Sequence, residues 1–374
     1  MNKIALRLVC FLLLLSISFC TISCGAQKDY IYKNDTKDYV YKYGDFVIDK
    51  NFYTYWLARY KAVLMYTYSD IKDTDEYWDT DHGSGSANDV LTSYADQTIM
   101  NYLASVYLFN KFALALSSSK VESVDKQLSE IVDDGYDGDV SALNAEAYQF
   151  GINYDMLRQI YMAEAKTEVV YSYLTSTVFS DKLTDELREK YLSENYAHTT
   201  HIFVATEYSY NIDKDGNIIY DSDGNYTTEL TDAEKAEQKK KIEKLDSLSI
   251  TRENFSEYQN EYNEDPAVSM YKNGFFVSSS NNYDAAYVTA ALTMSPGEVK
   301  KVEGSEGVYY ILKEEMPEGA YSNKDNSDFF DKYDSKILDY LYWQYMEQIY
   351  KDISINEEVK KGISVKSVSP CWYF

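Results

Sequence analysis

The chain has 374 residues, a formal net charge of −25 at pH 7 and 45% hydrophobic residues. So large an excess of acidic side chains argues against a nucleic-acid partner, because the phosphates would be repelled. The roughly 350 residues beyond the first two dozen are enough for two or three modest hydrophobic cores.

Residues 1–23 have the pattern of a secretory signal peptide. Lys3 and Arg7 precede an apolar run over residues 8–19, which is too short for a stable membrane span. The run ends in Thr-Ile-Ser-Cys-Gly, with small residues before Cys24, and this is similar to the lipobox of bacterial lipoproteins. The similarity implies lipidation of Cys24 and anchoring at the extracytoplasmic face of a bacterial cell membrane. Ordinary secretion and a retained membrane anchor are the alternatives.

The cysteines and histidines predict neither a disulfide nor a metal site. Cys10 and Cys20 would leave with the signal and Cys24 would carry lipid, so Cys371 is left without a partner for an internal disulfide. The three histidines and this cysteine lack the spacing of metal ligands. No metal or organic cofactor is therefore expected.

The N-terminal half predicts a tether followed by helices. Residues 24–44 are polar and charged without a clear period, which is typical of a flexible tether. Residues 45–193 have apolar residues three or four positions apart, with Asp49 and Thr184 as helix caps, and predict an all-helical domain. An insertion at residues 67–88 is rich in Asp, Gly and Ser and predicts a loop.

Residues 194–316 predict a small α+β domain, because runs typical of strands alternate here with helical patterns. The order is a strand at 200–204, two helices, a strand near 274–277, a helix near 283–292 and a strand at 307–313. Residues 207–230 predict a protruding hairpin, followed by the capping box of Thr231 and Glu234. The acidic spacing in this hairpin departs from an EF-hand loop, because glycine comes at the fourth position and no glutamate closes the loop. Calcium binding is therefore not expected.

Residues 317–374 return to helix, and this sets the predicted architecture. Apolar residues recur every three or four positions over 330–349, so the long helix needs an apolar partner surface. The simplest partner is the N-terminal helical region. The predicted fold is therefore α+β, with a helical domain formed by both ends of the chain and a small inserted α+β domain.

Motifs in the inserted segment carry a resemblance to a known family. They are His-Ile-Phe-Val at 201–204, the Phe-containing helix that leads from Phe255 to Asp265, the run of Tyr283 and Tyr287 into Gly-Glu-Val at 297–299, and Gly-Val-Tyr-Tyr-Ile-Leu at 307–312. Together they resemble the parvulin-type peptidyl-prolyl cis-trans isomerases. The flanking helices resemble the chaperone parts of the PrsA and SurA foldases, so the resemblance covers most of the mature chain.

The resemblance implies a site with several departures from the family pattern. The implied catalytic residues are His201, Asp265 and Tyr309, of which Tyr309 stands at the family's second histidine. The implied substrate-binding residues are Tyr283, Tyr287, Phe276 and Asn273. Tyr283 and Tyr287 occupy the family's Met and Phe places and Asn273 a hydrophobic one, so the proline cup is more polar than usual. A tyrosine hydroxyl at 309 could still hydrogen-bond His201, since it both donates and accepts.

Each of these residues also has a simple structural explanation. His201 alone fits a hydrogen-bonded strand histidine, and the four-residue spacing of Tyr283 and Tyr287 fits core packing. Asp265 before Pro266 fits a turn. His198 and His82 look like solvated loop residues. The 40 tyrosines fit either an adaptable peptide-binding surface or ordinary core packing and codon bias.

The leading functional prediction is an extracytoplasmic, lipid-anchored foldase that isomerises X-Pro bonds and chaperones unfolded or newly exported polypeptides. Its partners would be these polypeptides, the membrane through the lipid and, in one arrangement, a second copy in a homodimer. The alternative is a non-catalytic chaperone with a degenerate parvulin domain, which Tyr309 and Asn273 favour. A solute-binding lipoprotein fits less well, because the two-lobed α/β pattern is missing.

Overall fold

The computed structural model describes residues 39–372, apart from residues 69, 70, 82, 84, 214–217 and 282. The predicted signal peptide, Cys24 and most of the predicted tether lie outside the described residues, as does His82. In the described part of the chain, no helix is long and apolar enough to cross a membrane.

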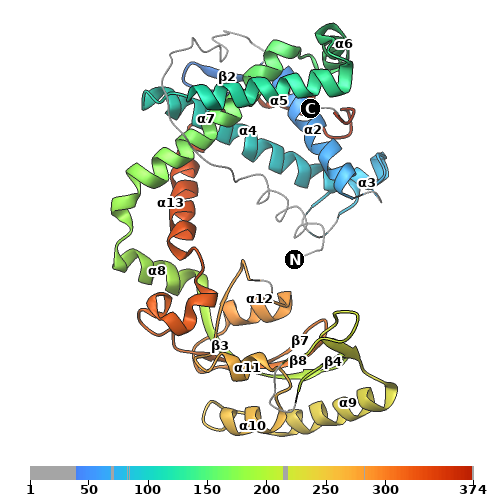
Figure 1. The fold of residues 1–374 in the computed structure, drawn as a ribbon, viewed down its shortest axis with the longest axis vertical. Coiled ribbons are helices and arrows are strands. Elements are labelled where there is room, and N and C mark those ends of the chain that lie inside the picture. The colour runs from blue at the N-terminus through green and yellow to red at the C-terminus, as the bar shows by residue number, and fades with distance from the viewer. Residues whose placement is uncertain are drawn as a thin grey trace. The chain divides into compact units, whose positions relative to one another are not determined.

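The chain divides into two compact units (Figure 1). The first combines the described residues up to Asp181 with those from Leu338 onward, and the second runs from Lys182 to Ile337. The predicted α+β architecture, with a small domain inserted in a helical one, is confirmed. The second unit is longer at both ends than the predicted segment 194–316, because the flanking residues pack into its core.

The first unit is mainly helical, and its helices begin at side-chain caps. Asp49 accepts hydrogen bonds from the backbone N–H groups of Asn51 and Phe52 at 3.0 and 2.9 Å and so starts the first helix. The elements are β1 (Tyr39–Tyr43), β2 (Phe46–Asp49), α2 (Lys50–Thr67), α3 (Asp75–Asp79), α4 (Ala87–Lys111), α5 (Ser118–Tyr136), α6 (Val140–Ala147), η1 (Tyr148–Phe150), α7 (Tyr154–Tyr173), the π-helical turn η2 (Leu174–Val178), η3 (Ser180–Lys182), β9 (Ser354–Ile355) and α14 (Glu357–Lys361).

Two predictions for this region are wrong. A three-stranded sheet of order β2-β1-β9 opens the unit, so residues 39–43 are a strand rather than tether and the segment 45–193 is not all helical. The predicted loop at 67–88 contains the short helix α3, whose Trp78 is fully buried. Burial of this large ring fixes the insertion against the helices.

The long C-terminal helix α13 (Tyr333–Tyr350) contributes its residues from Leu338 onward to the first unit. Tyr342 and Met346 are buried in an apolar cluster with residues of α4 and α7. The Tyr342 hydroxyl donates to the side-chain oxygen of Asn101 on α4 at 2.9 Å. The apolar stripe from Leu338 onward is therefore covered by α4 and α7, whereas Tyr333 and Ile337 pack in the second unit.

The second unit is built on a four-stranded antiparallel sheet of order β6-β3-β8-β7. β7 was not predicted, since its Val-Lys-Lys-Val-Glu sequence has little apolar character. The elements are α8 (Asp185–Asn195), β3 (Tyr196–Ala205), β4 (Tyr208–Tyr210), β5 (Thr227–Glu229), α9 (Asp232–Ser247), α10 (Phe255–Tyr262), α11 (Ala267–Met270), β6 (Phe275–Ser278), α12 (Ala285–Thr293), β7 (Val299–Glu303), β8 (Gly307–Glu314), η4 (Ala320–Ser322) and η5 (Lys324–Phe329).

The two faces of this sheet are covered by different helices. Figure 1 shows α12 on one side of the sheet and α9 and α10 on the other. Tyr287 of α12 packs in one apolar cluster, whereas Leu245 of α9 and Phe255 of α10 pack in another. β3 contributes to both clusters, with Tyr196 and Ala197 in the first and Ile202 and Val204 in the second.

Candidate active site

The candidate site is built on β3, the strand that pairs with both β6 and β8. His201 lies in the middle of β3, opposite Ile311 of β8, and is only 4% exposed. Thr199 and Phe203 share its face of the sheet, since they are two residues away on either side. A central strand of a paired sheet is a rigid support, so the imidazole has a fixed place.

Both ring nitrogens of His201 have hydrogen-bond partners. Nε2 lies 2.9 Å from Oδ2 of Asp265, and Nδ1 lies 3.1 Å from the Tyr287 hydroxyl, which in turn lies 2.9 Å from Oγ1 of Thr199. A carboxylate only accepts, so Nε2 donates to Asp265, and the Thr199 hydroxyl also donates to the Phe275 carbonyl at 3.5 Å. The hydrogen bonds therefore form a chain from Asp265 through His201 and Tyr287 to Thr199.

Asp265 is held beside His201 because the residues before it are hydrogen-bonded to β3, beyond the part of β3 that pairs with β6. The backbone N–H of Phe203 donates to the Asn263 side chain at 3.0 Å, and the N–H of Glu264 donates to the Phe203 carbonyl at 2.9 Å. Oδ1 of Asp265 accepts from the N–H of Ala267 at 2.8 Å, which leaves Oδ2 for His201. The carboxylate is therefore oriented by its own turn and by β3.

Aromatic rings form the walls around His201. The Phe275 ring stacks on the imidazole with centroids 4.7 Å apart, and the Tyr309 ring meets it edge-on at 5.7 Å. Tyr309 also lies 5.1 Å from Tyr287, and Tyr283 lies 6.0 Å from Tyr287. Tyr283 is 36% exposed while the others are largely buried, so it lies at the open side of this aromatic cup.

The surrounding tyrosines stay protonated at physiological pH. Burial raises the pKa of Tyr287 far above its usual value. The hydrogen bond with Thr199 lowers this pKa, and the charges of Tyr283, Tyr309 and Asp265 raise it further. Burial also raises the pKa of Tyr309, and it raises that of Tyr283 to about 12 with help from Tyr271 and Asp265. The hydroxyl of Tyr287 is thus available as a hydrogen-bond donor.

The structure brings together five of the seven residues predicted for the site: His201, Asp265, Tyr309, Tyr283 and Tyr287. The expected hydrogen bond from Tyr309 to His201 is replaced by the one from Tyr287. Tyr309 instead contributes its ring edge to the cup wall.

Phe276 and Asn273 lie elsewhere. Phe276 pairs with His198, one residue out of step with the cup face, and packs against Phe330 with centroids 5.1 Å apart. The neighbouring Phe275, and not Phe276, lies against His201 in the cup. The Asn273 amide donates to Asn326 on η5 at 3.2 Å, so its side chain ties two loops together.

His198 has a structural position that the sequence did not indicate. It belongs to β3 rather than to a solvated loop, and its ring stacks on Phe276 at 4.8 Å. Its ring nitrogens lie 2.8 Å from the carbonyl of Glu315 and 2.6 Å from the carbonyl of Asn273. The partners come from distant segments, so no local pattern could have revealed them.

No family model matches the sequence, and no curated protein matches it. Solved structures do match. PrsA from Bacillus subtilis is 18% identical, with 78% of this chain and 93% of that chain covered and a TM-score of 0.21. The chain is similar to PrsA foldases. The foldase protein PrsA from Streptococcus pneumoniae str. Canada MDR_19A is 14% identical, with 72% of this chain and 89% of that chain covered and a TM-score of 0.24. The peptidylprolyl isomerase PrsA from Bacillus cereus is 16% identical, with 76% of this chain and 90% of that chain covered and a TM-score of 0.24.

The similarity to PrsA extends over most of the chain, but at these identities and TM-scores it says nothing of individual site residues. The chemistry of the chain is therefore derived from its own contacts around His201. In the described part of the chain, no cluster of His, Cys, Asp and Glu could hold a metal ion. The groups available are an imidazole, a carboxylate and tyrosine hydroxyls within an aromatic cup.

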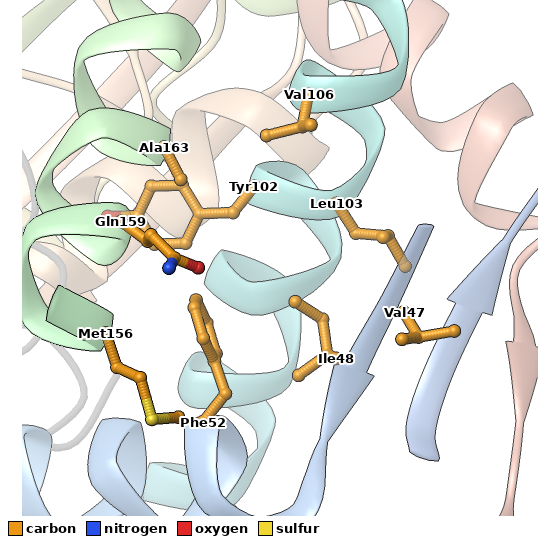
Figure 2. Close-up of a pocket in the computed structure, with 9 residues that line it drawn as sticks. All are labelled: Val47, Ile48, Phe52, Tyr102, Leu103, Val106, Met156, Gln159 and Ala163. Atoms are coloured by element: carbon orange, nitrogen blue, oxygen red, sulfur yellow. The ribbon is translucent and has the colours of Figure 1, made fainter. Parts of the chain in front are cut away.

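The helical unit contains a small apolar cavity (Figure 2). Its volume is about 20 Å³, which is room for one water-sized group. Side chains of β2, α2, α4 and α7 line it: Val47, Ile48, Phe52, Tyr102, Leu103, Val106, Met156, Gln159 and Ala163. A cavity of this size is a packing gap in this conformation and does not accommodate a polypeptide side chain such as Phe or Leu.

Proposed function

We propose that the chain is an extracytoplasmic, lipid-anchored foldase whose inserted unit isomerises X-Pro peptide bonds of unfolded, newly exported polypeptides. The observation that supports this best is the buried His201, held between Asp265 and Tyr287 at the base of an aromatic cup. The proline ring of a client would enter from the side of Tyr283, which is the exposed rim of the cup.

The cup suits amide rotation because this reaction needs no nucleophile. The X-Pro bond loses its partial double-bond character on twisting, with a barrier of about 20 kcal/mol and an uncatalysed time of tens of seconds. The planar amide is the more polar form, so removal from water disfavours it relative to the twisted form. Phe275, Tyr287 and Tyr309 would supply this water-poor surface.

His201 and its partners would keep the cup in shape. The imidazole is hydrogen-bonded to Asp265 through Nε2 and to Tyr287 through Nδ1, so its ring plane would be fixed beneath the incoming proline. A fixed geometry lowers the barrier only if it fits the twisted amide better than the planar one.

A refolding experiment tests the proposed function. The slow, proline-limited phase of a client protein should become faster with the mature chain, and a His201→Ala variant should lose most of this effect. Tyr66→Ala is the control, since Tyr66 is 85% exposed in the helical unit. A slow phase that the wild-type chain leaves unchanged would contradict isomerase activity.

A non-catalytic chaperone is the second candidate, favoured by Tyr309 at the family's second histidine position. In that case the cup would bind peptides without turning them. The mature chain would then suppress aggregation of an unfolded client, equally well with His201 or with alanine at this position, and would leave the slow refolding phase unchanged.

Lipid anchoring at Cys24 is part of the proposal, supported by the sequence alone. A labelled fatty acid should be incorporated into the wild-type chain in a bacterial host and not into a Cys24→Ala variant. Cys371→Ala is the matched control, because Cys371 is buried in the first unit. Incorporation that survives Cys24→Ala would contradict this anchor.

A homodimer is also a proposal that comes from the sequence. Sedimentation velocity of the mature chain over a range of concentrations tests it, and a single species of monomer mass at every concentration would contradict it.

A further inference from the structure

The β4–β5 hairpin displays an exposed aromatic and aliphatic surface. Tyr208, Tyr220, Tyr226, Ile212 and Ile219 are each between 47% and 69% exposed, which is unusual for large apolar side chains so close together in sequence. We call these five residues and Tyr210 the hairpin surface. None of them is used in the core of the inserted unit.

The hairpin surface is an ordered feature of the fold. The Tyr226 ring stacks on Tyr210 with centroids 6.4 Å apart and planes 17° apart, and it meets Tyr220 edge-on at 6.1 Å. Asp221 closes the turn by accepting from the backbone N–H groups of Asp223 and Asn225 at 2.9 and 2.8 Å. A surface with fixed ring positions can bind without first being ordered, which favours affinity.

Tyr210 connects this surface to the aromatic cup. Its ring lies 6.4 Å from that of Phe203, which lies 4.7 Å from that of Tyr309. Burial raises the pKa of Tyr210 to about 12, together with the nearby carboxylates of Asp265 and Glu306 and with Tyr226. At about 3.3 Å per residue, an extended peptide with proline in the cup reaches the hairpin within about three residues.

The charges around the hairpin surface identify the kind of side chain that fits it. The described residues 207–213 and 218–232 include six acidic residues and no lysine or arginine. Asp265 and Glu306 add negative charge where Tyr210 meets the cup. Aromatic faces attract cations, and the surrounding carboxylates strengthen this attraction and repel acidic peptides.

We propose that the hairpin surface is a second subsite, which binds an arginine or lysine side chain within about three residues of the client proline. The proposal rests on the proposed function insofar as the cup takes the proline. The client class is then an extended polypeptide segment that combines a cationic residue with proline. Tyr226 and Tyr210 are the specificity-determining residues, since their stacked rings offer a face to the cation.

Fluorescence anisotropy with labelled peptides tests this subsite on the mature chain. The peptides share an Ala-Pro core and carry Arg, Gln or Glu at one, two or three residues from the proline. The Arg peptide should bind about threefold to tenfold more tightly than the Glu peptide at one or more of these positions. The preference should shrink at 0.5 M salt, because exposed charges are screened.

Variants assign the preference to the hairpin. Tyr226→Ala should bring the Arg and Gln peptides to within about twofold of each other, whereas Tyr226→Phe keeps the ring and should retain the preference. Tyr66→Ala, a change at an exposed tyrosine of the helical unit, should alter nothing. Equal binding of the Arg and Glu peptides, or a preference unchanged in Tyr226→Ala, would overturn the proposal.

Two further measurements distinguish the cation subsite from the proposed isomerase function. A preference for Arg that persists when the peptide proline is replaced by alanine would overturn the link between the hairpin and the cup. A wild-type chain that prefers the Arg peptide through Tyr226 but does not accelerate isomerisation would retain the subsite and contradict only the catalytic activity.

Discussion

The neighbours of His201 fix the orientation of its ring. Its two ring nitrogens are used by Asp265 and Tyr287, and its faces and edges are covered by Phe275 and Tyr309. These four neighbours therefore fix the plane of the imidazole ring.

Tyr287→Phe removes one hydroxyl from this chain and leaves the ring in place. His201 Nδ1 and Thr199 then lose a buried partner, so we expect a loss of about 1–2 kcal/mol in the free energy of unfolding. Isomerisation should fall about tenfold or more, because the imidazole loses its orientation. Urea unfolding and peptide isomerisation rates measure the two effects. Tyr66→Phe makes the same change at an exposed site, and an equal effect there would contradict the role of Tyr287.

Gly274 permits the close approach of β6 to β3. Its φ is +82°, and a Cβ atom would lie 2.8 Å from His198 Nε2 and 2.8 Å from the Thr199 carbonyl. Gly297 has a similar φ of +83° but open space around it. Gly274→Ala should therefore cost about 1–3 kcal/mol of unfolding free energy beyond the cost of Gly297→Ala, as measured by urea unfolding. Equal costs would show that the contact with His198 does not matter.

Site residues could be predicted from the sequence only where they belong to a recognisable motif. Tyr287 on α12 and Tyr283 just before this helix lie in one cup, and His201 and Asp265, both assigned to the site from motifs, are hydrogen-bonded. The choice between Phe275 and Phe276 is a matter of strand register, in which one residue reverses the face. Hydrogen bonds between segments far apart in sequence, such as those of His198, leave no local signal.

At the scale of elements, helices were predictable and short strands were not. Asp49, Thr184 and Thr231 cap helices where the sequence predicts caps. β9 has two residues, and its partner β1 lies some 300 positions earlier in the sequence, so the pairing has no local pattern. β7 pairs on one side only and is mostly exposed, which explains its polar sequence.

An ion pair joins α8 to the start of α13 and predicts a pH effect. Arg188 contacts both carboxylate oxygens of Asp334 at 2.8 Å, and this hydrogen bonding lowers the pKa of Asp334. A lowered folded-state pKa stabilises the protein above the unfolded value of about 3.9, and this stability is lost as the pH falls through the folded value. Because Asp334 is half exposed, the contribution should be about 1 kcal/mol or less.

Urea unfolding of wild type and Asp334→Asn from pH 7 to pH 3 measures this contribution. The difference between the two should be largest near neutral pH and shrink below about pH 4. Asp185→Asn is the matched control, because Asp185 contacts Arg188 from an 87% exposed position and should matter less. A difference that is constant across this range would contradict the role of the ion pair.

At the scale of the molecule, tyrosine fills the cores of both units. Tyr53 and Tyr342 are buried in the first unit, and Tyr287 and Tyr310 in the second. The exposed tyrosines of the hairpin surface are a separate group, so the tyrosine content serves packing and, as we propose, binding. The insertion of one unit in the other was predictable because the sequence changes near Thr199 from helical periodicity to a run typical of a strand.

Lys61 fixes the C-terminal segment to the first unit. Its buried ammonium group donates to the carbonyls of Val365 and Val368 at 3.0 and 2.8 Å and lies 2.6 Å from Asp73. Lys61→Met should cost about 3 kcal/mol of unfolding free energy and speed proteolysis near residue 365. Isomerisation should be unchanged, because the candidate site belongs to the other unit. Lys126→Met, at a 77% exposed side chain, is the control; an equal effect of the two changes would contradict this role.

The most direct test of the account is cis-trans exchange of an Ala-Pro peptide, measured by exchange NMR with a catalytic amount of the mature chain. The account predicts faster exchange with the wild-type chain and with Tyr66→Ala, and exchange at the uncatalysed rate with His201→Ala, provided that this variant unfolds cooperatively. Wild-type exchange at the uncatalysed rate, or full activity in a folded His201→Ala variant, would contradict a catalytic site at His201.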